Sequence, residues 1–188
     1  MEINSESEDQ MTAIGRTPEN TNFLQQTKYT LTFPRLNNVT YFMQELNMPG
    51  LSINELPRNT PFIDLYVPGN KLSYDTFKVT FIIDEELRAY QDVHDWIRGV
   101  TDTKNFDEYA RLGRLAEKAT GMSPKQPQYA DGIATIYSAL NNPKIRLHFK
   151  NMFPTSISAI NFATTDTEVI TLTADVTFRF DYFDIERL

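Results

Sequence analysis

Apolar and polar residues alternate without interruption through residues 170–182. This period of two predicts one continuous β-strand with a buried face, about twice as long as a usual strand. The other face carries short polar side chains, which suits a barrel wall or the lining of a lumen. A strand edge of this length favours pairing with another subunit. The apolar positions are Ile170, Leu172, Ala174, Val176, Phe178, Phe180 and Tyr182, and the polar ones are Thr171, Thr173, Asp175, Thr177, Arg179 and Asp181.

Shorter alternating segments predict further strands, and turn residues separate them. Pro34 and Asn37-Asn38 mark a turn after the first segment, and Pro68-Gly69-Asn70 bounds the third. The pattern predicts a mainly β fold, a sandwich or barrel. The predicted strands are 29–33, 39–43 (continuing towards Met48-Pro49-Gly50), 62–67, 77–83, 133–140 and 145–149.

One segment has the period of a helix instead. Asp84 is a suitable N-cap, acidic residues follow it in the first turn, and Gly99 fits the C-terminal cap. We therefore predict a helix over 85–98 that packs on the sheet. Residues 100–132 resemble an insertion, with a second helix interrupted by Gly113. The apolar stripe of the first helix is Leu87, Tyr90, Val93, His94 and Ile97.

Charge divides the chain into two parts. Residues 1–26 hold Glu2, Glu6, Glu8, Asp9 and Glu19 against Arg16 alone, and few large apolar side chains. Such a segment does not bury enough surface to offset its ordering entropy, so we predict a flexible acidic arm. Residues 27–188 are expected to form a single domain. The arm is either an inert tail or a segment that orders on a neighbouring subunit.

Candidate chemistry is sparse. The sequence has no cysteine and two histidines, His94 and His148, which lie in different predicted elements. It has no phosphate-binding glycine loop, zinc-helix motif or nucleophile elbow. Asp84-Glu85-Glu86 is explained by the start of a helix. We therefore expect no catalytic site, no metal and no cofactor, and hence a structural protein that is not an enzyme.

Hydropathy and net charge indicate where the protein is made and which partners it does not bind tightly. No apolar run is long enough to span a bilayer, and the first residues lack a signal-peptide core, so we expect a soluble protein made in the cytosol. The formal net charge of −7 opposes tight binding of nucleic acid phosphates.

Four stretches in order resemble the tail tube proteins of contractile-tailed bacteriophages, which are related in fold to the haemolysin-coregulated tube proteins of type VI secretion. The first is FMQELNMPG at 42–50, and the second is VPGNKLSYD at 67–75 followed by FKVTF at 77–81. The third is Asp84-Glu85 opening a helix that reaches Trp96. The fourth is FPTSI at 153–157, followed by the long alternating segment.

The resemblance implies a tail-tube fold whose strands join those of five neighbours in a ring barrel. Stacked hexameric rings would form a hollow conduit for DNA ejection, inside a contractile sheath and attached to baseplate or neck proteins. Such a protein belongs to the virion tail and is assembled in the host cytoplasm, and double-stranded DNA passes through it without specific binding. Candidate lumen-lining residues are Thr171, Thr173, Asp175, Thr177 and Asp181, and candidates for contact with the next ring, in the segment 51–67, are Leu51, Phe62, Ile63, Leu65 and Val67.

Three alternatives stay open at this point. The arm and the insertion are longer than a minimal tube subunit needs, which leaves room for a specialised ring of the same fold, either a baseplate tube initiator or a neck terminator. The segment 51–67 could instead form an ordinary hairpin within the subunit. A monomeric β-barrel that binds a small apolar ligand is the third alternative.

Overall fold

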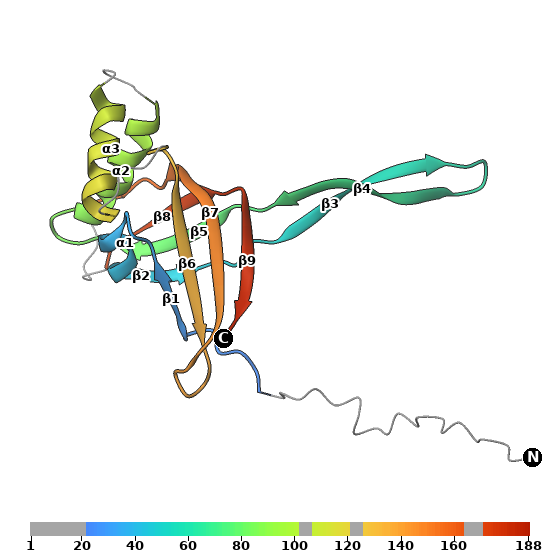
Figure 1. The fold of residues 1–188 in the computed structure, drawn as a ribbon, viewed down its shortest axis with the longest axis horizontal. Coiled ribbons are helices and arrows are strands. Elements are labelled where there is room, and N and C mark those ends of the chain that lie inside the picture. Colours follow the sequence, from blue (N-terminus) through green and yellow to red (C-terminus); the bar gives the residue numbers. More distant parts are fainter. Residues whose placement is uncertain (1–21, 102–106, 121–125, 164–170) are drawn as a thin grey trace, which may run out of the picture.

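The computed structural model describes residues 22–101, 107–120, 126–163 and 171–188. Within these ranges the protein is mainly β, as the alternating patterns predict (Figure 1). The strands are β1 (Tyr29–Thr32), β2 (Met43–Leu46), β3 (Leu51–Asn59), β4 (Asp64–Tyr74), β5 (Phe77–Ile82), β6 (Ala130–Tyr137), β7 (Pro143–Ile157), β8 (Thr173–Arg179) and β9 (Tyr182–Arg187). The helices are α1 (Asn37–Phe42), α2 (Arg88–Thr101) and α3 (Asp107–Thr120).

Two layers of antiparallel strands share the long strand β7. Sheet I contains β1, β6, the first half of β7, and β9. Sheet II contains β2, β5, β8 and the last part of β7. β7 changes layer near Asn151, whose φ of 54° lies in the left-handed region. Figure 1 shows the strands of the two sheets crossing, with the helices on one side and the β3–β4 hairpin projecting from the other.

An aromatic core joins the sheets to α2. The ring of Phe178 in β8 lies 5.5 Å from that of Phe33, 6.3 Å from that of Phe77 and 6.2 Å from that of Trp96. These side chains are almost completely buried. Their burial supplies the main stabilising free energy of the body, because each large aromatic removes 150–250 Å² of surface from water.

Polar contacts around Trp96 hold Pro127 and Gln128, at the end of the predicted insertion, against the body. The guanidinium of Arg35 lies 4.4 Å from the centre of the Trp96 ring and donates a hydrogen bond to the carbonyl of Pro127. Trp96 Nε1 donates to the carbonyl of Gln128 at 3.0 Å. Burial lowers the pKa of Arg35 to about 10, so its side chain stays charged at neutral pH.

The prediction of one unbroken strand over 170–182 is wrong. β8 ends at Arg179 and β9 starts at Tyr182, and the backbone turns between them. Asn151 Nδ2 donates to Asp181 Oδ2 at 2.6 Å, and the Asp181 amide donates to the carbonyl of Lys150 at 3.1 Å. The break is a consequence of the change of layer in β7, because β8 pairs with its last part and β9 with its first part.

The lateral edges of β8 are both occupied within the subunit. β5 pairs with one edge over the register from Phe77↔Phe178 to Ile82↔Thr173, and β7 pairs with the other. The expectation that the edge of this segment pairs with another subunit is therefore also wrong for β8. Pairing between subunits needs other strand edges.

Two turns that were predicted from the sequence are not turns in the structure. Residues 37–42 form α1, where a turn at Asn37-Asn38 and a strand from 39 were predicted, because Leu36 and Val39 are both buried in the core at helical spacing. Pro68-Gly69 lies inside β4 rather than at its end, at an irregularity where β3 and β4 shift register between Ile53 and Glu55. A Cβ on Gly69 would lie 2.5 Å from the carbonyl oxygen of Asn54, so only glycine fits this close approach.

Both predicted helices exist, with different ends. α2 starts at Arg88 rather than 85, because Leu87 has a φ of 57° that a helix does not accommodate. Gly99 is inside α2 instead of capping it: a Cβ there would lie 3.0 Å from Leu112 Cδ1, so the glycine allows α2 and α3 to pack closely. Gly113 does not interrupt α3.

Asp84 lies four residues before α2 rather than at the N-cap position that was predicted, but its carboxylate still binds the first helical amides. Replacing Asp84 with Ala should therefore destabilise the body by about 1 kcal/mol, the usual contribution of a capping side chain. The Asp84 carboxylate accepts hydrogen bonds from the amides of Arg88 at 3.0 Å and Ala89 at 3.1 Å. Burial acts to raise the pKa of Asp84, but these hydrogen bonds outweigh it and hold the pKa below its usual value. The contribution is therefore present above the ordinary carboxyl pKa and is lost as pH falls through the lower folded value. Urea unfolding at pH 7 and pH 3 checks this, and an equal loss in Asp84→Ala at both pH values would contradict it.

Candidate assembly surfaces

The β3–β4 hairpin projects from the body as a separate two-stranded ribbon (Figure 1). Every residue of β3 is exposed, and β4 is exposed except at Gly69 and Tyr74, which are half-buried. Thr60 and Ile63 close the turn at its tip, where the Thr60 amide donates to the Ile63 carbonyl at 3.3 Å. The segment 51–67 is thus part of a hairpin within one chain, which extends to Tyr74 and projects away from the body.

The five predicted contact residues all lie on this hairpin and are all exposed. Phe62 at the tip is 98% exposed, and Leu51, Ile63, Leu65 and Val67 are between 45% and 64% exposed. Further exposed apolar residues were missed. Ile53 and Leu56 stand apart from other large apolar residues, Leu72 lies beyond Pro68-Gly69, where the strand was expected to end, and Tyr66 lies inside the predicted strand without having been selected. These additional residues are Ile53, Leu56, Tyr66 and Leu72.

Apolar cross-strand pairs occupy two sections of the ribbon. Leu51 faces Tyr74 and Ile53 faces Leu72 near the body, whereas Leu56 faces Val67 towards the tip. The irregularity at Gly69 separates the two sections. Apolar residues therefore continue along most of the ribbon, from its base to its tip.

Such a ribbon is not stable by itself in water. An isolated two-stranded hairpin is at best marginally stable, because it has no third layer against which to bury its apolar face. An exposed apolar surface of this extent marks an interaction site. The hairpin therefore has the exposed apolar surface that is typical of docking elements.

Free strand edges provide a second kind of assembly surface. Among the described residues, β2 pairs with β5 alone, so the other edge of β2 is open. The last part of β7, 153–157, likewise pairs with β8 on one edge alone in this part of the chain. Sheet II is thus a four-stranded sheet with an open edge at each end, a geometry that allows sheets of successive subunits to join.

Three of the five predicted lumen-lining residues share one face of sheet II. Thr173, Asp175 and Thr177 alternate with the buried residues of β8, so they point away from the core. Thr171 precedes the strand, and Asp181 lies in the bend after it.

This polar face is neutralised locally rather than purely acidic. Lys78 Nζ lies 2.8 Å from Asp175 Oδ2, and Thr80 Oγ1 donates to Asp175 Oδ1 at 2.6 Å. The hydrogen bonds from Lys78 and Thr80 hold the pKa of the Asp175 carboxyl below its ordinary value, so it is ionised at neutral pH. The face is therefore hydrophilic with paired charges, which suits contact with water.

The two histidines of the sequence, the candidate catalytic bases, lie on different elements of the structure. His148 Nε2 lies 3.0 Å from Glu186 on the surface of sheet I, while His94 is beside Asp95 on α2. No three metal-ligating side chains gather in the described parts of the chain. Nor does any described helix have the length and apolar character to cross a membrane.

Comparisons with known proteins identify relatives of this architecture. The chain is 26% identical over 171 residues to the tail tube terminator protein of Enterobacteria phage T4, covering 86% of this chain and 88% of that protein. The tube-terminating cap of the anti-feeding prophage superposes with a TM-score of 0.61 at 13% identity, covering 94% of this chain and 100% of the cap chain.

A sheath/tube terminator from the PVC extracellular contractile injection system, in its extended state, has a TM-score of 0.56 at 10% identity, covering 89% of this chain and 99% of the other. At these identities the two superpositions establish a common fold. The sequence model of the phage tail tube protein family matches residues 10–186, nearly the whole chain. The chain therefore belongs to the phage tail tube protein family, whose members are components of the virion tail.

Proposed function

We propose that this chain is a tail tube terminator, a structural, non-enzymatic subunit whose copies close into a ring that caps the tail tube. The observation that carries the proposal is the apolar hairpin, which is a docking element without a cover in the single chain. The terminator assignment is supported by the similarity to the T4 tail tube terminator over most of both chains.

Self-association explains both assembly surfaces. A ring needs a heterologous contact, in which one surface of each subunit meets a different surface of the next. The two open edges of sheet II, at β2 and at 153–157, provide such a pair. The hairpin then lies against a neighbouring copy and buries its apolar residues there. Six copies, as the tail-tube resemblance implies, would form the ring.

The polar face of sheet II faces the channel in this arrangement. Thr173, Asp175 and Thr177 then line the lumen, with Lys78 neutralising Asp175. A surface of hydroxyls and paired charges has little attraction for phosphates, so double-stranded DNA passes without being held. Assembly takes place in the host cytoplasm, and the outer surfaces contact sheath, neck or baseplate proteins.

A stacking tube subunit is the second candidate, because the same hairpin could bind a further copy in a next ring. The monomeric ligand-binding barrel is disfavoured because aromatic side chains such as Phe77, Phe149 and Phe178 fill the space between the sheets. The two structural functions differ in one property. A tube subunit extends indefinitely, whereas a terminator stops extension.

Growth of tubes from the cognate tube protein tests this difference. Added at a few copies per tube end, the purified chain should arrest elongation and leave tubes with one capped end, measured by electron microscopy and light scattering. By itself it should give rings of uniform height. Long hollow filaments of the chain alone would overturn the terminator assignment and support a stacking subunit.

A further inference from the structure

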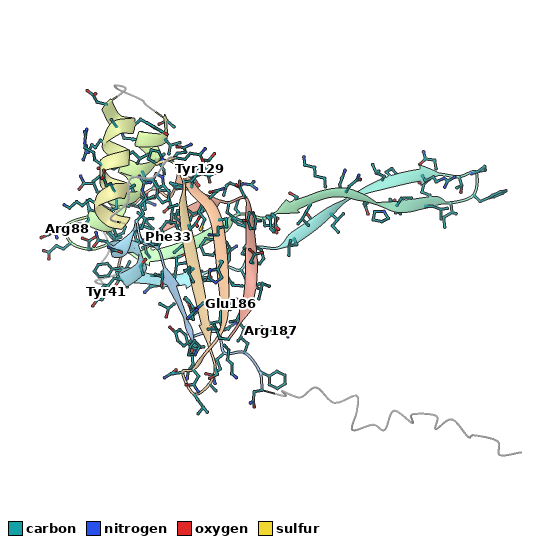
Figure 2. The ribbon with its side chains drawn as sticks, in the orientation of Figure 1. Phe33, Tyr41, Arg88, Tyr129, Glu186 and Arg187 are labelled. Carbon is teal, nitrogen blue, oxygen red and sulfur yellow. The ribbon has the colours of Figure 1, made fainter. Side chains whose placement is uncertain are left out.

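Positive side chains gather at one end of sheet I, where the chain enters and leaves the sheet. Arg146 lies opposite Glu186 in the register of β7 and β9, and Arg187 lies opposite Ile145. The Lys28 carbonyl accepts a hydrogen bond from the Tyr137 amide at 3.0 Å, which places Lys28 at this end too. Figure 2 labels Glu186 and Arg187 at the end of β9. The basic end is defined here as Lys28, Lys144, Arg146 and Arg187.

The charges of the basic end are only partly compensated. Arg146 Nη1 is 3.9 Å from Glu186 Oε2, and the same oxygen is 3.0 Å from His148. Lys28 Nζ donates a hydrogen bond to the carbonyl of Ala139, a neutral partner. Among the described residues, no carboxylate lies within ion-pair distance of Lys144 or Arg187.

Four cations therefore share one acidic side chain, that of Glu186, in the described part of this end. The whole chain, in contrast, has a formal net charge of −7. A net positive patch on an acidic protein attracts negatively charged segments, and the attraction acts over about one Debye length, about 8 Å at physiological salt.

We propose that the acidic segment 1–21 docks on the basic end of its own molecule, along the open edge of β9. This segment carries five carboxylates, Glu2, Glu6, Glu8, Asp9 and Glu19, against Arg16 alone. It joins the body through exposed residues 22–27, directly before Lys28, so its carboxylates are tethered beside the patch.

The edge of β9 gives this segment backbone partners as well as charges. Among the described residues β9 pairs with β7 alone, so its outer amides and carbonyls are open. An extended segment that adds to such an edge gains main-chain hydrogen bonds. Ile185 on β9 is 55% exposed and offers an apolar contact there. This docking uses sheet I, and it is separate from the sheet II edges assigned to ring closure.

Carbodiimide crosslinking of the full chain tests the docking, because this reagent joins a carboxylate to a lysine only where the two groups touch. Mass spectrometry should find Lys28 and Lys144 joined to Glu6, Glu8 or Asp9, each at least thirteen residues before the described part of the chain, which begins at residue 22. In a mixture of ¹⁴N- and ¹⁵N-labelled protein, the linked peptides should carry a single label, as expected within one molecule.

Charge reversal then separates docking from chance contact. The Arg146→Glu/Arg187→Glu variant keeps both lysines and should lose these crosslinks about fivefold or more. The matched control, Arg114→Glu/Lys118→Glu, makes the same change in charge at exposed positions of α3 and should keep them. Adding 0.5 M NaCl to the unmodified chain should reduce them similarly, which tests the proposal even if the double variant misfolds.

Three results would overturn the proposal. They are mixed-label peptides, crosslinks at Lys28 and Lys144 no more abundant than at the exposed hairpin residue Lys71, and crosslinks insensitive to both salt and charge reversal. None of these results depends on whether the ring is a terminator, since the docking takes place within one subunit.

Discussion

Replacing both Leu56 and Val67 with Asp should abolish assembly of the chain while leaving its body folded. These residues face each other across the hairpin and are about half-exposed in the single chain. Burying a Leu or Val side chain contributes about 1.5–3 kcal/mol, so losing two at each contact and introducing charge there weakens the contact about 100-fold or more. In sedimentation velocity experiments, the sedimentation coefficient should fall from that of a ring to that of a single subunit.

Tyr41→Asp is the matched control for this loss of assembly. Tyr41 is 82% exposed on α1, an exposed apolar residue outside the hairpin, and its replacement should leave the sedimentation coefficient unchanged. Because the hairpin contributes no side chain to the buried core except near its base, circular dichroism of the double variant should match that of the unmodified body. Normal rings from Leu56→Asp/Val67→Asp would contradict the role of the hairpin.

Phe178→Ala should cost about 3–5 kcal/mol of the free energy of unfolding, a large fraction of the stability of a typical domain. Its ring contacts Phe33 before α1, Phe77 of β5 and Trp96 of α2, so its removal leaves a cavity where the sheet meets the helix. Urea unfolding checks this, best in the assembly-deficient hairpin variant, because association adds to apparent stability.

Phe62→Ala makes the same chemical change at a site that is 98% exposed, so it serves as the control for Phe178→Ala. In the unassembled chain it should alter the free energy of unfolding by less than about 0.5 kcal/mol. In the assembled chain it should weaken association instead. Equal destabilisation by the two substitutions in the unassembled chain would refute the assignment of core and contact surface.

Periodicity predicts the strands of the body because each has one buried and one exposed face. It fails at 180–183 for a definite reason. Phe180 and Tyr182 continue the apolar alternation, but Phe183 is the residue that is buried and Tyr182 is exposed. With aromatic residues at both 182 and 183, either face is equally apolar. The choice is made by the turn of β7 at Asn151, a tertiary constraint that local pattern does not carry.

The sequence pattern did not predict the short helix α1, for a related reason. Val39, Tyr41 and Met43 alternate as a strand does, and their β-branched and aromatic side chains favour that structure. Packing of Val39 into the core overrides this preference for six residues, and β2 then begins at Met43. Propensity is a weak guide for segments this short.

Among the candidate assembly residues, the sequence pattern located the hairpin set correctly and the lumen-lining set only in part. The hairpin residues were found because large apolar side chains such as Phe62 and Ile63 stand in a segment rich in turn residues. Two of the five candidate lumen-lining residues, Thr171 and Asp181, lie outside β8, because the set rested on a continuous strand. Thr173, Asp175 and Thr177 share a face, and the bend takes Asp181 away from it.

Electron microscopy of the purified full chain tests the central claim most directly. The claim is that the hairpin is covered by a neighbouring copy in a closed ring. Averaged images should show rings of uniform height with a central channel and with no hairpin projecting freely. Isolated single subunits at high protein concentration, each with its hairpin extended into solvent, would contradict the account.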